Sequence, residues 1–313
     1  MASRLHARVG TLRQMEILLA VYRSGSITGA AEQLHLTQPT VSMQLSKLAE
    51  SLDIALYYTV GKKICFTEAG EAAVQTAIEV LACFERLDMT LSGLKGLMQG
   101  TLSLSIVTTA KYFIPHLIGD FSQQNPQIDA RFRVGNRRQI IEQLTAGLDD
   151  FYVFSHPPAN DRLELIEFLS NRLVAIAPKS HPLAQKKRVT LSEFCQAPFL
   201  MREEGSGTRH AIDSYLAHLG CTLNVRMTIE SNEAIKYAVM SGMGVSILSE
   251  HTLAFGDRTG LAILEVDQLS IVTHWYLVRL KNKPMSPVAK AFLDFIRQNS
   301  PRVFRINAEG DTP

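Results

Sequence analysis

The first part of the chain contains short amphipathic segments separated by strong capping signals. Apolar positions over 12–21 predict a helix that Gly25 ends. Ser26 is a suitable N-cap for a second helix, and Thr37 for a third that begins with a proline in its first turn. The pattern therefore predicts three short helices over residues 11–52.

The pattern then changes twice. Residues 55–66 alternate enough to predict a short hairpin. From Glu68 to about Met98 one long helix is expected, because apolar residues recur at intervals of four and three: Ala73, Ala77, Val80, Phe84, Leu87, Leu91, Leu94 and Met98. Since nothing local covers this stripe, we expect it to pair with a second chain. The alternative is a core helix of the following domain.

Two comparable series of strands and helices follow residue 100. The first comprises segments 102–107, 112–124, 129–134, 138–146 and 151–154. The second comprises segments 173–177, 199–202, 208–219, 225–229, 232–241 and 245–248. Strand–helix alternation of this kind is typical of parallel α/β sheets. The repetition predicts two lobes with a cleft between them.

Composition narrows the class of protein. The chain has 313 residues, 46% hydrophobic and 20% charged, and a net charge of +2, which is ordinary for a globular protein. No apolar run is long enough to span a membrane and no secretory signal is visible, so we expect a cytoplasmic protein. The four scattered cysteines predict reduced thiols rather than a disulfide framework or a zinc site.

Catalytic and metal-binding patterns are missing from the sequence. The nine histidines form no metal-binding pair, and Ser206 lacks the flanking glycines of a nucleophile elbow. We therefore expect neither an enzyme nor a bound metal or cofactor. Two rival classes remain to be weighed, an enzyme on the α/β scaffold and a periplasmic solute-binding protein.

The third helix has a surface suited to the DNA major groove. Its inward positions Val41, Leu45 and Leu48 leave a small, polar outer face, from which Gln38 or Gln44 could read an adenine edge. The residues expected at DNA are Ser26, Thr28, Gln38, Pro39, Thr40, Ser42, Gln44 and Lys47, with Lys62 and Lys63 at the hairpin tip. The alternative is a helical bundle whose polar face is merely solvated.

Three loops of the second half follow strands and lead into helices. The loop over 202–209 carries Gly205 and Gly207 directly before a helix, where free backbone N–H groups favour an anion. The residues expected at an effector are Thr108, Thr109, Lys111, Asn136, Arg137, Arg202, Gly205, Ser206, Gly207 and Thr208. They predict a phosphorylated or carboxylated metabolite. The alternative is that the glycine-bearing loop is only a turn and cap.

The segment TLRQMEILLAVYRSGSITGAAEQLHLTQPTVSMQLSKLAESL, followed by GKKICFTEAG, resembles the N-terminal signature of LysR-type transcriptional regulators. In that family the TQP-x-VS segment opens the recognition helix, and the segment matching Phe66–Gly70 opens the linker helix. The sequence departs from the family at Thr59, where an arginine is usual, so a backbone contact is not expected there. The resemblance covers essentially the whole chain.

The resemblance implies an α/β protein with an N-terminal winged helix-turn-helix, a long linker helix and a two-lobed effector domain like periplasmic binding proteins. The boundaries we expect are 1–66 for DNA binding, 67–98 for the dimerising helix, 99–300 for the effector domain and 301–313 for a tail. Within the effector domain, lobe I comprises 99–172 and 273–300, and lobe II comprises 173–272. The implied partners are promoter DNA, RNA polymerase, a small anionic metabolite and further copies of the chain.

A finer resemblance lies in the second half. The stretches VGNRRQIIEQL, LDDFYVFSHPP, PFLMREEGSGTRHAIDSYL, SNEAIKYAVMSGMGVSILSEHTL and HWYLVRLKNKPMSPVAKAFLDFI are similar to the CbbR group of RuBisCO operon regulators. This implies activation of carbon-fixation genes in response to a phosphorylated metabolite or NADPH. The alternative is a LysR-type regulator of another pathway. The sequence leaves open the effector, the operator, activation against repression, and dimer against tetramer.

Overall fold

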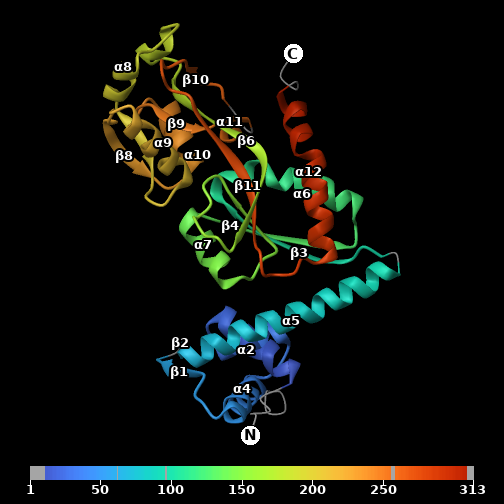
Figure 1. Ribbon diagram of the computed structural model, residues 1–313. Helices are drawn as coiled ribbons and strands as arrows, with labels where there is room; N and C mark the ends of the chain where they lie inside the picture. Colours follow the sequence, from blue (N-terminus) through green and yellow to red (C-terminus); the bar gives the residue numbers. More distant parts are fainter. Residues whose placement is uncertain (1–10, 62, 96, 255–257, 309–313) are drawn as a thin grey trace. The chain divides into compact units, whose positions relative to one another are not determined.

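The chain folds into two compact units, Met1–Lys95 and Gly96–Pro313 (Figure 1). The computed structural model describes residues 11–61, 63–95, 97–254 and 258–308, of which 300–308 by backbone alone. No described helix combines the length and apolar character needed to cross a bilayer.

As far as the structure describes it, unit 1 comprises a three-helix module, a hairpin and a long helix. Its elements are α2 (Leu12–Ser24), α3 (Ile27–Leu34), α4 (Gln38–Leu52), β1 (Tyr57–Val60), β2 (Lys63–Phe66) and α5 (Glu68–Leu94). The predicted caps are present: Gly25 ends α2 in the left-handed region, and the hydroxyl oxygens of Ser26 and Thr37 accept from the backbone of the first turns of α3 and α4. Local capping chemistry therefore fixes the ends of these helices.

The entry to α5 depends on a close backbone approach. Thr67 caps α5 and also donates from its hydroxyl to the Ala55 carbonyl at 2.7 Å. A Cβ atom placed on Gly70 would lie 1.8 Å from the Leu56 carbonyl oxygen. Only glycine fits at this position, which gives a physical reason for the glycine that ends the GKKICFTEAG segment.

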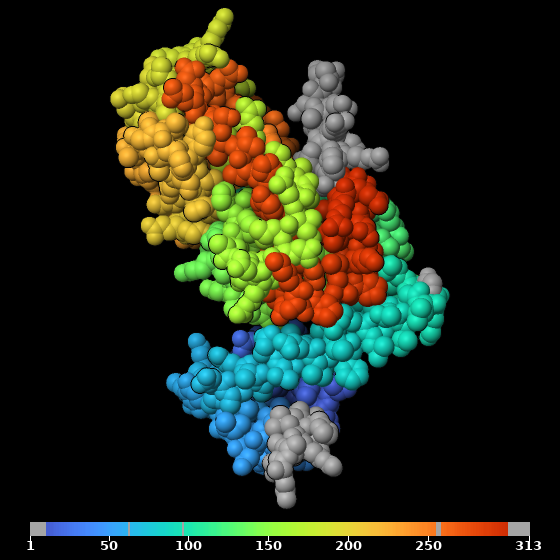
Figure 2. Space-filling model, in the orientation of Figure 1, coloured from blue at the N-terminus to red at the C-terminus, as the bar shows by residue number. Residues whose placement is uncertain are grey.

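The apolar stripe of α5 is covered only in its first half. Val74, Ala77 and Ile78 are buried. Further along, the predicted seam residues Phe84, Leu87, Leu91 and Leu94 are between 47% and 81% exposed. The helix (cyan in Figure 2) ends at Leu94, four residues before the predicted end.

Unit 2 is a mixed α/β structure. Its elements in chain order are β3 (Gly100–Val107), η1 (Thr108–Tyr112), α6 (Ile114–Gln124), β4 (Ile128–Gly135), α7 (Arg137–Ala146), β5 (Phe151–Phe154), β6 (Leu163–Pro178), η2 (Pro182–Gln185), α8 (Leu191–Gln196), β7 (Phe199–Arg202), α9 (Gly207–His218), β8 (Val225–Ile229), α10 (Asn232–Met240), β9 (Ser246–Ser249), α11 (Glu250–Ala254), β10 (Leu261–Leu264), β11 (Ile271–Leu280) and α12 (Pro287–Ala308). The last helix includes the first residues of the predicted tail.

The main sheet is not purely parallel, which corrects the sequence-based expectation. Its strand order is β10-β6-β11-β5-β3-β4, with β9 also paired to β6. Strand β3 runs parallel to β4 and β5, but β11 is antiparallel to both β5 and β6. The parallel arrangement holds between β7 and β8. Strand β11 and the first part of β6 were missed, because their pairing joins segments about a hundred residues apart in the chain, whereas the end of β6 was predicted as the strand over 173–177.

Strands β6 and β11 connect the two halves of unit 2. In the first half, the sheet lies between α7 on one side and α6 with α12 on the other (Figure 1). In the second half, β6 pairs with β9 and β10. Helices α8 to α11 belong to this half and lie between β6 and β10 in the chain. The predicted lobe boundaries fall on neighbouring residue pairs of the β6–β11 ladder, Arg172 with Val272 and Leu173 with Ile271.

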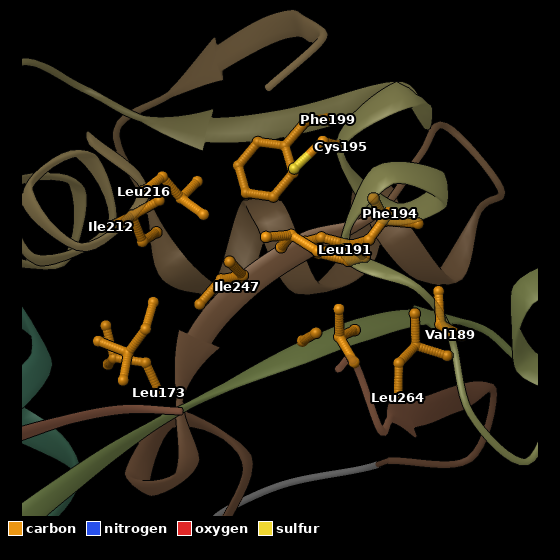
Figure 3. Packing of buried hydrophobic residues seen from close by; sticks show 14 of the residues in the cluster. Leu173, Val189, Leu191, Phe194, Cys195, Phe199, Ile212, Leu216, Ile247 and Leu264 are labelled. Carbon is orange, nitrogen blue, oxygen red and sulfur yellow. The ribbon is translucent and has the colours of Figure 1, made fainter. Parts of the chain in front are cut away.

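Strand β6 separates two apolar cores by simple alternation. Leu173, Ala175 and Ala177 belong to the cluster that packs against α8 and α9 (Figure 3). The intervening Val174 and Ile176 belong to a second cluster with residues of α10 and α11. Because successive side chains of a strand point to opposite faces, this run of apolar residues needs helices on both sides of the strand.

Candidate DNA-recognition and effector sites

Helix α4 presents an exposed face opposite its buried residues. Val41, Leu45 and Leu48 are at most 2% exposed. At the centre of the opposite face Pro39, Met43 and Lys47 are exposed, at spacings of four residues. This is the geometry of a helix that lies on its module by one side and offers the other to a partner.

The predicted base-reading residues differ in whether their side chains already form hydrogen bonds within the module. Gln38 is exposed at the start of α4. The Gln44 amide oxygen instead accepts a hydrogen bond at 3.0 Å from the side chain of Gln14 on α2. The Thr40 hydroxyl is 2.8 Å from that of Thr37. Gln38 is therefore the better candidate for base contact, and Gln44 for holding α4 against α2.

The remaining predicted DNA contacts are at the edges of this face. Ser42 is half-buried, Thr28 is exposed on α3, and Ser26 accepts from the Gly29 amide as the N-cap of α3. Lys63 is exposed at the start of β2, whereas Lys62 lies outside the described residues. Met43, which was not among the residues expected at DNA, is also exposed on this face.

In unit 2, a pocket of about 320 Å³ opens at the first turn of α9. Its lining residues are Arg137, Glu204, Gly205, Ser206, Arg209, His210 and Asp213. Ser206 is the N-cap of α9, yet its side chain makes no capping hydrogen bond within the described part of the chain. The first N–H groups of a 12-residue helix thus remain available to an acceptor.

Arg137 is the cation best placed to bind an anion in this pocket. It is the first residue of α7, and its Nε donates to the His156 carbonyl oxygen at 2.8 Å. Partial burial lowers its pKa from the usual value. Among the described residues no carboxylate lies within ion-pair distance of its guanidinium, so no described acidic side chain neutralises its positive charge.

Two histidines lie beside Arg137. The rings of His156 and His210 meet edge to face, with centroids 5.0 Å apart. Burial, with the charges of His210 and Arg137, lowers the pKa of His156 to about 4. The buried Nδ1 of His156 has no hydrogen-bond partner among the described residues. A bound anion would relieve the crowding of positive groups here.

Arg202 is less available to an effector than expected, because its charge is already paired within the fold. Its side chain is 3% exposed and forms two hydrogen bonds to the Glu203 carboxylate, at 2.8 and 2.9 Å. It also donates to the Asn232 side chain and to the Glu230 carbonyl oxygen. Such a fully partnered guanidinium stabilises the fold rather than offering a free charge.

Several other predicted effector residues are also engaged. The Thr108 hydroxyl donates to the Gly135 carbonyl at 3.1 Å, and the Thr109 hydroxyl accepts from Asn232 at 3.1 Å. Lys111 pairs with Glu233 at 2.7 Å. Through Thr109 and Lys111, η1 of the first half is tied to the start of α10 in the second half.

Of the residues expected at the effector, Arg137, Gly205 and Ser206 line the pocket. Asn136 caps α7, and buried Thr208 and the backbone of Gly207 belong to the first turn of α9 without lining it. The residues that were missed include His210 and Asp213, one helical turn apart on α9. Their spacing of three was visible, but nothing in the sequence indicated which face of α9 meets the pocket.

No group of three or more His, Cys, Asp or Glu side chains within the described ranges is arranged to hold a metal ion. The pocket at α9 combines a helix N-terminus with the cationic side chains of Arg137 and Arg209 and the carboxylates of Glu204 and Asp213. A winged helix-turn-helix joined to a ligand-binding unit with two lobes defines the class of one-component DNA-binding regulators.

Comparison with known proteins identifies the family. Residues 12–71 match the description "Bacterial regulatory helix-turn-helix protein, lysR family", and residues 95–301 match "LysR substrate binding domain". The chain belongs to the LysR family of bacterial transcriptional regulators.

Two relatives match nearly the whole chain. The HTH-type transcriptional activator CmpR of Synechocystis sp. is 44% identical over 91% of this chain and 94% of its own. A RuBisCO operon transcriptional regulator of Acidithiobacillus ferrooxidans is 37% identical, over 97% and 96% respectively.

Solved structures agree with the fold. The CcmR regulatory domain of Synechocystis, in complex with 2-PG, is 41% identical and superposes with a TM-score of 0.62, covering 65% of this chain and 99% of that domain. The LysR-family regulator CbnR is 20% identical with a TM-score of 0.67, over 93% of this chain and 99% of that one. The two-lobed α/β architecture expected from the sequence is thereby confirmed.

Proposed function

We propose that this protein activates carbon-fixation genes in response to a phosphorylated metabolite, which binds at the pocket between α7 and α9. The observation that carries the proposal is the guanidinium of Arg137, which has no carboxylate partner among the described residues and lines the same pocket as the open N-terminus of α9. A dianionic phosphate group matches both features, because it accepts several N–H donors and neutralises a charge that is only partly hydrated.

The choice of metabolite class rests on two independent lines of support. One is the pocket itself, to which Arg137 contributes a cationic side chain and His210 a protonatable one, whereas Arg209 is paired with Glu204 and Asp213. The other is the CcmR regulatory domain, whose structure contains 2-PG, that is 2-phosphoglycolate. We therefore propose 2-phosphoglycolate as the first effector to test, with ribulose 1,5-bisphosphate and NADPH as the competing candidates.

The carbon-fixation role is supported by the RuBisCO operon regulators among the relatives. CmpR, which is more similar, is named an activator without a named operon. A LysR-type regulator of another pathway is the alternative.

In the proposed mechanism, two chains pair through the exposed seam of α5, and α4 of each enters the major groove of promoter DNA. Pairing by a two-fold axis predicts a palindromic site with half-sites spaced by helical turns. Effector binding changes the angle between the lobes and relaxes a bend in the DNA, which exposes contacts for RNA polymerase. The ligand must bind one arrangement more tightly than the other for this to occur. The complex would be a dimer of dimers in the cytoplasm, without catalytic activity.

The test is DNase footprinting on the DNA upstream of the protein's own gene, at fixed salt, with and without each metabolite. We expect a long protected region whose hypersensitive bands change with 2-phosphoglycolate. Protection that ignores all three metabolites would retain DNA binding and reject the proposed effectors. A protein that fails to protect this DNA would contradict the proposal at its first step.

A pair of adjacent arginines supplies the matched control. Arg137→Gln should weaken 2-phosphoglycolate binding about tenfold or more, because a charge-assisted hydrogen bond contributes about 1.5–3 kcal/mol. Arg138 is exposed and does not line the pocket, so Arg138→Gln should bind as the unsubstituted protein does. Equal effects of the two substitutions in calorimetric titrations would place the phosphate elsewhere.

A further inference from the structure

Two cysteines that are far apart in sequence meet in the second half of unit 2. Cys195 is near the end of α8 and is 8% exposed. Cys221 follows Gly220 after α9 and is half-buried. Both pack against the apolar cluster around α8 and α9, and the Cys221 side chain is near enough to raise the pKa of Cys195. The fold thus joins two thiols that the sequence leaves scattered.

Backbone hydrogen bonds hold the two segments together. The Cys221 amide donates to the Leu216 carbonyl at 3.1 Å, which fixes it to the last turn of α9. The Asn224 amide donates to the Cys195 carbonyl at 3.0 Å, and the Asn224 side chain donates to the Gln196 carbonyl at 3.1 Å. Figure 3 shows Cys195 beside Phe199 at one edge of the cluster. The fold therefore fixes the segment that follows Cys221 beside the end of α8, which carries Cys195.

The two thiols differ in reactivity. Burial, together with the neighbouring Cys221 side chain, raises the pKa of Cys195 to about 11, so Cys195 is protonated at neutral pH. Cys221 is the more accessible of the two. Since access and thiolate character govern attack on an oxidant, oxidation should begin at Cys221 and Cys195 should act as the resolving thiol.

We propose that Cys195 and Cys221 form an oxidisable pair that hydrogen peroxide converts into an intramolecular disulfide. The Cys221 sulfur attacks one peroxide oxygen, the O–O bond breaks, and a sulfenic acid and one water form. The Cys195 sulfur then displaces the hydroxyl group of the sulfenic acid, which leaves as water with the Cys195 thiol proton. The two thiols lose two electrons, the peroxide gains two, and a dithiol reductant reverses the change.

The other two cysteines are in unit 1 and serve as internal references. Cys83 is exposed on α5 and Cys65 is half-buried on β2. An effect of general oxidation would act on exposed Cys83 first. The proposal instead requires the buried Cys195 to lose its free thiol together with Cys221.

The test uses the full chain, reduced and then treated with a small excess of hydrogen peroxide. Remaining thiols are alkylated with N-ethylmaleimide, and the protein is mapped by peptide mass spectrometry. We expect a linked Cys195–Cys221 peptide, no label on either residue, and recovery of both labels after dithiothreitol. The same result is expected in a Cys65→Ser/Cys83→Ser variant, in which free thiols fall from two to none.

Single substitutions distinguish the order of events. In Cys195→Ser, dimedone should trap a sulfenic acid on Cys221, because the resolving thiol is missing. In Cys221→Ser, Cys195 should keep its thiol under the same peroxide. Labelling of both cysteines after peroxide would overturn the proposal, as would sulfinic acid on Cys221 beside a labelled Cys195. Mapping of the unsubstituted chain keeps the test valid if a variant fails to fold.

Discussion

The buried ion pair at the end of β7 allows a direct test of the assignment of Arg202. The substitution is Arg202→Met, which retains much of the side-chain volume and removes the charge. The Glu203 carboxylate, only 12% exposed, is then left without its two guanidinium hydrogen bonds. The side-chain oxygen of Asn232 and the Glu230 carbonyl also lose a donor.

The expected loss of stability is large for a single substitution. Removing one partner of a buried pair costs about 3–5 kcal/mol. Because Glu203 retains slight exposure, we expect a value near the lower end, about 3 kcal/mol. With a urea dependence of about 2–3 kcal/mol per molar, the midpoint of unfolding should fall by roughly 1 M.

The single tryptophan makes the assay specific. Trp275 is fully buried in β11, so its fluorescence during urea unfolding reports on unit 2. Arg188→Met is the control, because the Arg188 side chain is 78% exposed and its carboxylate partner is 3.9 Å away. That variant should change stability by less than about 1 kcal/mol.

A double variant distinguishes a structural role of Arg202 in the ion pair from a role in effector binding. The double variant Arg202→Met/Glu203→Leu removes both charges and should recover most of the stability lost in Arg202→Met. A different result would refute the reasoning: an Arg202→Met protein with an unchanged urea midpoint that no longer binds 2-phosphoglycolate. Arg202 would then be an effector contact after all.

Three further predictions concern single positions. Gly70→Ala should destabilise unit 1 by at least about 1–3 kcal/mol, as the new methyl group meets a carbonyl oxygen, whereas Gly93→Ala, with open space around it, should be neutral or stabilising in thermal unfolding. The depressed pKa of His156, about 4, means that the unfolded chain takes up a proton at a higher pH than the folded one. The free energy of unfolding should therefore fall by about 1–2 kcal/mol as the pH falls from 6.5 towards 4, after allowance for the partial exposure of His156. Urea titrations at several pH values should show a flatter dependence of stability on pH for His156→Gln than for the unsubstituted protein. In binding titrations Gln38→Ala should weaken specific DNA binding by about 1–3 kcal/mol more than non-specific binding, while Lys47→Ala should weaken both and lower the salt slope by about one.

The parts of the fold that local chemistry determines were the parts the sequence predicted well. Gly25 ends α2 and Ser26 begins α3 because both act within one helical turn of their own position. The winged module and the entry to α5 were instead expected from the resemblance to the LysR-type signature. Strand β11 was missed, because its partner β6 is supplied by a distant segment and its own apolar pattern does not identify that partner.

In the candidate site too, local features were predicted and contacts between distant segments were not. Three of the residues expected at an effector, Arg137, Gly205 and Ser206, line one pocket. The sequence did not place His156 there. That histidine follows β5, and its neighbours His210 and Arg137 come from two other elements. The three segments come together only in the folded protein, so the residue pattern along any one of them does not predict that they meet.

Arg202 shows why charge alone is an unsafe guide to a binding site. Its neighbour Glu203 was visible in the sequence, but adjacent residues of a strand point to opposite faces and should not pair. Arg202 is the last residue of β7, and Glu203 lies beyond the end of the strand, where this alternation no longer applies. Arg137 begins a helix, and no carboxylate within the described ranges comes within ion-pair distance of it. The availability of a cation for an effector thus depends on which partners the backbone allows it to reach.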